Sequence, residues 1–227
     1  MKIIFAATPD ISISCLEEIL NSSHEISLIL TMPDKPAGRG KKLLPSPIKK
    51  FCFENDLPFI QPENLKSIEV KNIFKEIESD LLIVFAYGKI IPKDIFELPT
   101  YGSVNVHTSL LPSYRGAAPI QRAIINGDKF TGITIMKLSE GLDEGPIIES
   151  FKVAIEEEET SGSLAEKMSK VSSNKILQII ENIELNSIKY IEQDHSKASY
   201  ADKLLKSESC IALSLIHISE PTRHSII

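Results

Sequence analysis

The chain has 227 residues, of which 42% are hydrophobic and 25% are charged, and its formal net charge is −6. This length supports one substantial core or two small ones, and the composition is that of a globular protein in water. The apolar run near the N-terminus is too short for a signal peptide or a membrane span, so we expect a cytoplasmic protein with no membrane partner.

Strand and helix patterns alternate along the first half of the chain. We expect strands at residues 2–7, 26–30, 81–86 and 103–107, and helices at 12–20, 46–53 and 65–77. The run LLIVFA at 81–86 is continuously apolar, as in a strand covered on both faces. Further along, 147–155 fits an antiparallel edge strand and 163–183 an amphipathic helix. This order predicts an α/β fold with a doubly wound, mostly parallel sheet that binds ligands at the carboxyl ends of its strands.

The first loop, Ala7-Thr8-Pro9-Asp10, lacks the G-x-G-x-x-G pattern of dinucleotide-binding folds. No G-x-x-x-x-G-K-[ST] pattern occurs in the sequence either. A nicotinamide or flavin cofactor and ATP hydrolysis are therefore not supported.

The cysteines and histidines do not have the spacing of a metal site. Cys15, Cys52 and Cys210 are an odd number, far apart and without a C-x-x-C pair. This argues against a disulfide framework and against zinc. The five histidines also lack ligand spacing relative to the cysteines. We expect reduced, buried cysteines and no metal.

The segment from residue 34 to residue 50 is distinguished by its charge. It contains six basic residues and one acidic residue, whereas the rest of the chain has 19 basic and 30 acidic residues. A charge run is most often a solvated surface loop. On an acidic chain, however, positive charge concentrated around Pro36, Gly38 and Gly40 indicates a phosphate-bearing partner.

The most informative stretch runs from residue 103 to residue 145. In a strand, the alternation Val-Asn-Val-His at 104–107 places Asn105 and His107 on one face and the two valines on the other. An amide that can hold an oxyanion, beside an imidazole that can move a proton, suits acyl-type transfer. Asp143, in a glycine-flanked turn, can present a carboxylate that orients the ring and favours its charged form. The alternative is that His107 is a hydrogen-bonded structural residue, and the residue types alone leave both interpretations open.

Longer motifs in this stretch carry a resemblance to a known family. They are Asn105-Val-His107, Ser109-Leu-Leu-Pro112, Tyr114-Arg-Gly-Ala-Ala-Pro-Ile-Gln-Arg122, Gly132-Ile-Thr-Ile-Met136 and Leu142-Asp-Glu-Gly145. Together they resemble the formyltransferases that use 10-formyltetrahydrofolate, and among these the branch that acts on methionyl initiator tRNA. The resemblance covers residues 2 to about 206 and implies the Rossmann-like fold of that family.

The resemblance also implies the roles of particular residues. The family's catalytic triad falls on Asn105, His107 and Asp143. The folate-binding run falls on Ser109, Leu110, Leu111 and Pro112, and the end of the strand near residues 81–89 would form part of the pterin pocket. The basic segment resembles an insertion that contacts the acceptor end of the initiator tRNA, with Arg39 as the matching arginine and Lys41 and Lys42 beside it.

The implied reaction moves a formyl group from the co-substrate 10-formyltetrahydrofolate to the α-amino group of methionine on initiator tRNA, for translation initiation. We expect a monomer. A formyltransferase acting on another amine, a ribonucleotide or an amino sugar, would keep the triad but would not need the basic segment, since related glycinamide-ribonucleotide transformylases lack such an insertion. A non-catalytic folate- or RNA-binding module is the third possibility, and in that case the triad would be dispensable.

The resemblance divides the chain in two. Residues 1–206 are expected to form the formyltransferase catalytic domain and the start of a linker. Residues 207–227 are expected to be a linker remnant and an artefactual tail, since LSLIHISEPTR at 213–223 resembles a translated sequencing adapter. The family's C-terminal tRNA-binding β-barrel domain is then missing, and the alternative is a naturally short homologue.

Overall fold

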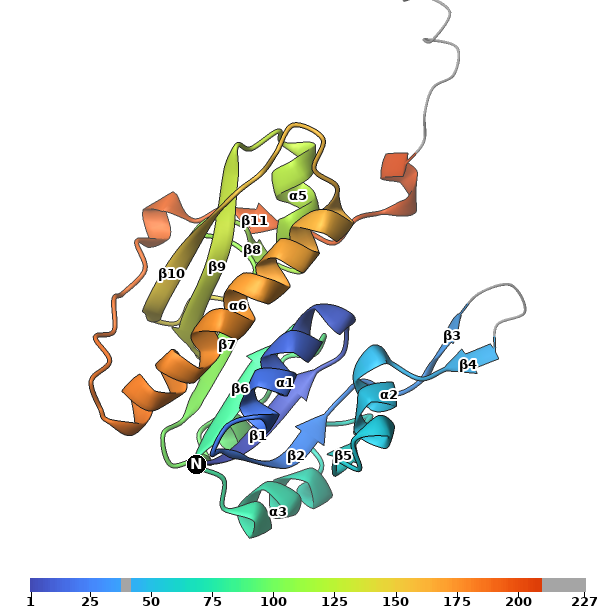
Figure 1. Cartoon of the computed structure of the whole chain (residues 1–227), viewed down its shortest axis with the longest axis vertical. Helices are drawn as coiled ribbons and strands as arrows, with labels where there is room; N and C mark the ends of the chain where they lie inside the picture. Colours follow the sequence, from blue (N-terminus) through green and yellow to red (C-terminus); the bar gives the residue numbers. More distant parts are fainter. Residues whose placement is uncertain (38–41, 210–227) are drawn as a thin grey trace, which may run out of the picture.

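A seven-stranded sheet is the centre of the fold in residues 1–37 and 42–209, the parts of the chain that this computed structural model describes (Figure 1). The strand order is β10-β9-β7-β6-β1-β2-β5. The strands are β1 (Lys2–Ala7), β2 (Glu25–Leu30), β5 (Phe59–Ile60), β6 (Leu81–Phe85), β7 (Ser103–His107), β9 (Phe130–Lys137) and β10 (Ile147–Ala154). All neighbouring pairs from β7 to β5 are parallel, while β9 is antiparallel to both β7 and β10. The predicted α/β class, with a mostly parallel sheet and an antiparallel edge strand near 147–155, is confirmed.

Helices connect the strands and cover both faces of the sheet. They are α1 (Ile13–Leu20), α2 (Pro47–Glu54), α3 (Ile68–Ile77), α4 (Lys93–Phe96), α5 (Pro119–Ile125) and α6 (Ser161–Glu184), with short 3₁₀ turns η1 (Asp10–Ser12), η2 (His195–Lys197) and η3 (Lys206–Ser209). Helices α1 and α6 lie side by side across one face (Figure 1). Side chains of α3 and α4 pack on the other face.

Two short strand pairs complete the described structure. β3 (Lys35–Ala37) and β4 (Lys42–Leu44) form an antiparallel hairpin at the basic segment, while β8 (Arg115–Gly116) pairs in parallel with β11 (Tyr200–Ala201). The second pair brings the chain after α6 back to the end of β7.

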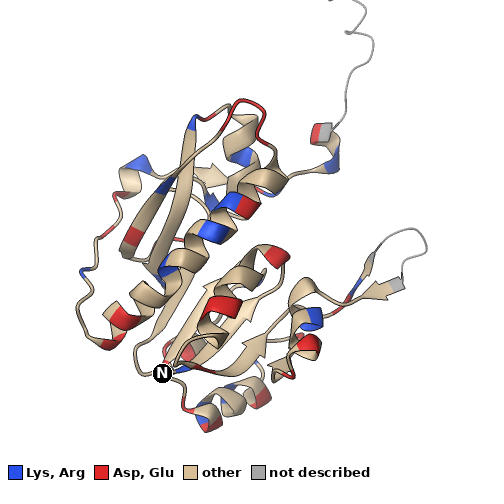
Figure 2. Cartoon of the chain, in the orientation of Figure 1, with Lys and Arg blue, Asp and Glu red and all other residues tan. Residues whose placement is uncertain are grey.

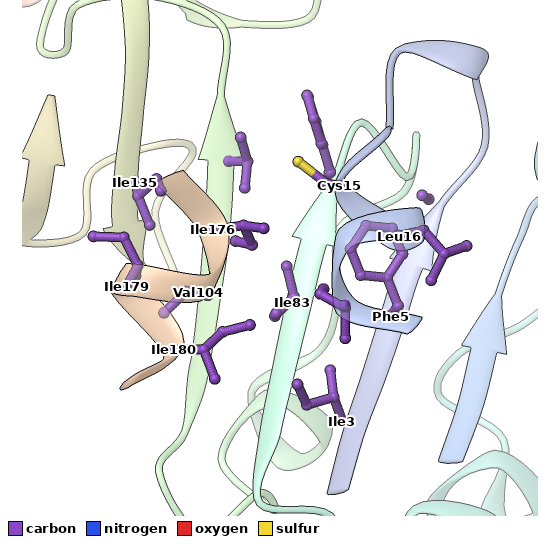
Figure 3. Close-up of a cluster of buried hydrophobic side chains, with 14 of the residues drawn as sticks. Ile3, Phe5, Cys15, Leu16, Ile83, Val104, Ile135, Ile176, Ile179 and Ile180 are labelled. Carbon is purple, nitrogen blue, oxygen red and sulfur yellow. The ribbon is translucent and has the colours of Figure 1, made fainter. Parts of the chain in front are cut away.

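Period-two alternation along the strands divides the core into two apolar clusters. On β1, Ile3 packs in the cluster under α1 and α6, whereas Ile4 packs in the cluster under α3. Figure 3 shows the first cluster, in which Leu16 of α1 and Ile176 of α6 lie against the strands. Burying a large apolar side chain stabilises the fold by about 1.5–3 kcal/mol, so these two clusters are its main support.

Side-chain caps set where the helices begin. Ser46 accepts a hydrogen bond from the backbone N–H of Lys49 at the start of α2, and Ser67 accepts one from Val70 at the start of α3. Because Ser67 is the cap, α3 begins at residue 68 and not at the predicted 65. Thr160 forms a capping box, so α6 begins two residues before the predicted 163.

Strand β9 lies in a segment whose sequence pattern did not predict a strand. Glycine weakens strand propensity, and Gly132 interrupts the β-branched pattern of this segment. The structure explains the glycine, because an added Cβ would collide with the Phe151 carbonyl oxygen and the Leu110 side chain. Strand β9 therefore needs a glycine where it passes between β10 and the loop after β7.

Charged side chains lie mainly on the helices and loops, and the central strands β6 and β7 carry none (Figure 2). Within residues 1–37 and 42–209, no helix is long and apolar enough to cross a membrane. Cys15 and Cys52 are free and buried, as predicted for them, while Cys210 lies outside the described residues. Burial raises the pKa of the Cys15 thiol to about 12 and that of Cys52 to about 11, so both thiols stay protonated near neutral pH.

Candidate active site

A cavity of about 620 Å³ opens over the carboxyl ends of β6 and β7. Its lining includes residues 84–91, at the end of β6 and in the loop that follows, residues 105–108 at the end of β7, and the loop 138–143 that follows β9. In open α/β sheets, ligands bind outside the carboxyl ends of the strands. The cavity lies at this edge of the sheet.

Strand β7 sends two polar side chains toward the cavity because its apolar residues are used on the other face. Val104 and Val106 pack in the cluster under α1 and α6. Asn105 and His107 alternate with them and line the cavity. The structure thus brings together the two polar residues that the alternation placed on one face.

Asp143 completes the group from the loop after β9. Its Oδ1 accepts a hydrogen bond from Asn105 Nδ2 at 3.3 Å, and its Oδ2 accepts one from the Gly116 N–H at 2.8 Å. Oδ2 also lies 3.6 Å from His107 Nδ1, in a pair whose side chains are only 7% and 12% exposed.

The two ring nitrogens of His107 have different partners. Nε2 lies 2.8 Å from the carbonyl oxygen of Tyr114. Since a carbonyl oxygen can only accept, Nε2 carries a proton and donates it. Nδ1, which faces Asp143, is then the nitrogen that can gain or lose a proton without breaking that bond.

The turn that carries Asp143 has demanding backbone geometry. Asp143 has a φ of +52°, a left-handed conformation that Asp tolerates better than most residues. At Gly145, an added Cβ would collide with the carbonyl oxygen of Lys137. The glycine after the turn therefore allows the loop to approach β9 closely and to aim the Asp143 carboxylate back at β7.

The remaining lining of the cavity is mostly apolar. Tyr87 is 1% exposed, and among the described residues its hydroxyl has no hydrogen-bond partner. Burial raises the pKa of Tyr87 to about 12, so the phenol is neutral. Ile90 and Leu142 are exposed parts of the lining. An apolar cavity with a few convergent polar groups is typical of a small-molecule site.

The proposed folate run follows β7 and is hydrogen-bonded to Thr134 on β9. Ser109 is fully buried and donates its hydroxyl hydrogen to the Ser113 carbonyl, while the Leu111 N–H donates to Thr134 Oγ1 on β9. None of Ser109, Leu110, Leu111 and Pro112 lines the cavity. The run is therefore not part of the lining, and its role in folate binding stays a prediction.

The proposed tRNA contacts fall largely outside the described structure. Arg39 and Lys41 lie outside the described residues, and Lys42 is placed only as the first residue of β4. The base of the hairpin is described. There, Lys49 Nζ donates to Asp34 Oδ2 at 2.7 Å and Gln61 Nε2 donates to Asp34 Oδ1 at 2.9 Å.

Two residues near the site were missed by the sequence analysis. Arg115, between Tyr114 and Gly116, is 1% exposed, and Gln193, which follows α6, is 5% exposed. Arg115 lies in the motif at residues 114–122, for which the resemblance implied no particular role. Gln193 has no signal in the sequence, because its contacts are with residues about 50 and 78 positions away.

No metal site is found in the part of the chain that the structure describes. There, no group of three or more His, Cys, Asp or Glu side chains could hold an ion. The chemistry available from the described residues is that of an amide donor, an imidazole and a carboxylate. Such a set can stabilise an oxyanion and move protons.

Comparison with known proteins agrees with the motifs. The sequence model of the family described as Formyl transferase matches residues 1–180. The methionyl-tRNA formyltransferase of Dictyoglomus thermophilum is 45% identical over 212 residues, covering 93% of this chain and 68% of that protein. The methionyl-tRNA formyltransferase of Hydrogenovibrio crunogenus is 41% identical over 209 residues, covering 92% and 67%.

Solved structures of related enzymes share the fold. A phosphoribosylglycinamide formyltransferase from Bacillus halodurans has a TM-score of 0.65 and 25% identity, covering 82% of this chain and 96% of that one. An N-formyltransferase from Helicobacter canadensis, solved with folinic acid and dTDP-3-aminofucose, has a TM-score of 0.67 and 21% identity, covering 88% and 70%.

Proposed function

The chain belongs to the formyl transferase family and, within it, to the methionyl-tRNA formyltransferases, and we propose that it formylates the α-amino group of methionyl initiator tRNA from 10-formyltetrahydrofolate. The observation that carries the chemistry is the convergence of Asn105, His107 and Asp143 on one cavity. On this proposal, the chain acts in translation initiation.

The reaction begins when the amine attacks the formyl carbon. The carbonyl electron pair moves onto oxygen, and Asn105 Nδ2 donates a hydrogen bond to the developing oxyanion. The amine releases a proton, which passes to Nδ1 of His107 beside Asp143. When the tetrahedral intermediate collapses, the bond to the folate nitrogen breaks and that nitrogen takes up the proton held on Nδ1 of His107, which returns the ring to its starting form. Every step proceeds without a covalent enzyme intermediate.

Asp143 has two tasks in this scheme. Its Oδ1 accepts from the Asn105 amide, which fixes the direction in which the other Nδ2 hydrogen points. Its Oδ2 faces His107 Nδ1 and stabilises the imidazolium that forms during the reaction. The Gly116 N–H holds the same oxygen, so the carboxylate keeps one orientation.

The cavity has a size and a mostly apolar lining that suit a small organic co-substrate. Its size of about 620 Å³ falls in the usual range for small-molecule sites, about 300–1,000 Å³. The pterin-pocket prediction for residues 81–89 is supported by the position of 84–89 in the lining. The run 109–112 keeps its proposed role in folate binding, and its hydrogen bonds with Thr134 on β9 help to fix the loop after β7.

The basic segment is proposed to meet the tRNA. Arg39, Lys41 and Lys42 would neutralise phosphates near the acceptor end, and Arg39 would add the planar, multi-donor contact that Lys cannot make. The fixed base of the hairpin, where Asp34 joins Lys49 and Gln61, supports this role because it anchors the segment beside β2 and β5.

The test is a transfer assay that offers two amines. With radiolabelled formyl donor, we expect product on methionyl initiator tRNA and at least 10²-fold less on glycinamide ribonucleotide. Asp94→Asn, which changes only an exposed ion pair with Lys71, is the matched control and should keep the wild-type rate. Equal or greater transfer to the ribonucleotide would overturn the assignment of the acceptor. No transfer to either amine would overturn the proposed formyl-transfer activity.

A further inference from the structure

We propose that Gln193 is a positioning residue of the active site and that, together with Arg115, it holds the turn that carries Asp143. The inference rests on the proposed function, because it concerns the geometry of the proposed triad. Gln193 lies beyond residues 1–180, which match the family model, so membership of the family does not assign it this task.

Gln193 joins the Asp143 turn to a buried arginine. Its Nε2 donates to the carbonyl oxygen of Asp143 at 2.9 Å and to that of Gly145 at 2.8 Å. Its Oε1 accepts from Nη2 of Arg115 at 2.7 Å and from Nε at 3.2 Å. Both hydrogens and both lone pairs of the amide are therefore used.

The orientation of this amide follows from its neighbours. The guanidinium of Arg115 can only donate, and the two carbonyl oxygens can only accept. Rotating the Gln193 amide by half a turn would oppose donors to donors and acceptors to acceptors, and four hydrogen bonds would be lost. The arrangement has one satisfied state, which is what a rigid support requires.

Arg115 is itself held on several sides. Its Nη1 donates to Glu144 Oε1 at 3.3 Å, and its Nη2 lies 3.3 Å from Nδ1 of His195, which must accept because Arg cannot. Its backbone N–H donates to the Ser199 carbonyl at 2.8 Å, in the pairing of β8 with β11. A buried guanidinium that lost these partners would be left uncompensated, so its position is strongly fixed.

The two supports reach Asp143 from different directions. The residue after Arg115 is Gly116, whose N–H holds the Asp143 carboxylate at 2.8 Å. Gln193 holds the main chain of the same residue. With both in place, Asp143 keeps its left-handed φ of +52° and its distance of 3.6 Å from His107. A misplacement of only about 1 Å can cost on the order of 10²-fold in rate.

The segment that supplies Gln193 is tied to the sheet by its own bonds. The backbone of Ile191 exchanges hydrogen bonds of 2.8 Å and 2.9 Å with Ile147 at the start of β10. Gln193 follows two residues later. The chain after α6 therefore returns to the active site and completes it, rather than acting only as a connection.

Gln193→Glu is the sharpest test. The variant keeps the length of the side chain and an oxygen for Arg115, but it replaces the two N–H donors with an acceptor that faces two carbonyl oxygens. We expect kcat to fall by about 10- to 10²-fold while the KM for the formyl donor changes by less than about 2-fold. Asp194→Ala is the matched control. It removes the hydrogen bonds that Asp194 accepts from Ser196 in η2 but leaves every bond of Gln193, and it should keep the wild-type kcat.

A double-mutant cycle separates positioning from general structure. If Gln193 acts through Asp143, Gln193→Glu should cost less than about 2-fold in kcat in an Asp143→Asn background. A cost equal to that in the wild type would overturn the proposal, since it would show an effect independent of Asp143. If Gln193→Glu does not fold, Gln193→Met, which keeps the volume and removes the hydrogen bonds, takes its place in the cycle.

Hydrogen exchange gives a measurement that needs no substrate. Amides of residues 138–145 should exchange at least about 10-fold faster in Gln193→Glu than in Asp194→Ala, because the turn loses its support. Equal exchange in the two variants would overturn the proposal even in an active enzyme. A wild-type chain that formylates nothing would overturn the proposed function, whereas the exchange result would still decide whether Gln193 holds the turn.

Discussion

Replacing Asp143 by Asn removes one negative charge from the active site and keeps the shape of the side chain. The Asn oxygen can still accept from the Gly116 N–H, so the turn itself should persist. Two things are lost: the charge that lies 3.6 Å from His107 Nδ1, and the hydrogen bond from Asn105, whose Nδ2 would then face the new amide nitrogen. The substitution therefore tests the charge of Asp143 together with its hold on the Asn105 amide, while the bond from Gly116 is kept.

The distance between Asp143 Oδ2 and His107 Nδ1 sets an upper bound on the loss of rate in Asp143→Asn. Two unit charges 3.6 Å apart attract by about 5 kcal/mol at an effective dielectric constant of about 20. Each 1.36 kcal/mol changes a rate tenfold, and part of the attraction is offset by the desolvation of two mostly buried groups. Loss of general acid–base assistance sets the lower bound, near 10²-fold. We expect kcat to fall by between about 10²- and 10³-fold.

The assay is single-turnover formyl transfer at saturating methionyl initiator tRNA, together with direct measurement of formyl-donor binding. Because the charge acts on an imidazolium that forms during the reaction, kcat should fall while donor affinity changes by less than about 2-fold. The Asp94→Asn control should match the wild type in both measurements. A fall of less than tenfold in kcat, or a loss of donor binding as large as the loss of rate, would refute this role for Asp143.

The other predictions concern the remaining triad residues, the basic segment, the base of the hairpin and the core. Asn105→Ala should lower turnover by on the order of 10²-fold through loss of an oxyanion donor, and His107→Ala by 10²-fold or more, in the same transfer assay. Neutralising Arg39, Lys41 and Lys42 together should reduce the slope of log tRNA affinity against log salt by roughly 0.7 to 0.9 per lost phosphate contact. An unchanged slope would identify the segment as a solvated loop. The hydrogen bond from Lys49 lowers the pKa of Asp34 below its ordinary value of 3.8. This pair therefore stabilises the fold above pH 3.8 and loses its contribution as the pH falls further. The urea midpoints of the wild type and of Lys49→Met should converge as the pH is lowered. Phe5→Ala, in the fully buried cluster of Figure 3, should cost about 3–5 kcal/mol in the free energy of urea unfolding.

Local patterns in the sequence were sufficient to predict the positions of most strands of the sheet. The continuous apolar run of β6 and the alternation of β7 were predicted at or within one residue of their bounds, because burial on both faces and burial on one face leave different periods in the sequence. The pairing of Asn105 with His107 followed from the same alternation. The position of β9 did not follow, since its Gly132 serves a packing contact with β10 and Leu110 that no local pattern reveals.

The sequence by itself determined the fold class and the family, and it supplied the residues of the proposed triad, because strand and helix periods and family motifs are short patterns along the chain. Only the tertiary structure decided how the triad is assembled. It placed the Asp143 carboxylate within reach of Asn105, His107 and Gly116, left residues 109–112 out of the cavity lining, and brought Gln193 from 50 positions away to the Asp143 turn. The physical reason is that hydrogen bonds between distant segments depend on how the sheet and its loops close in space, and that closure leaves no periodic trace along the chain.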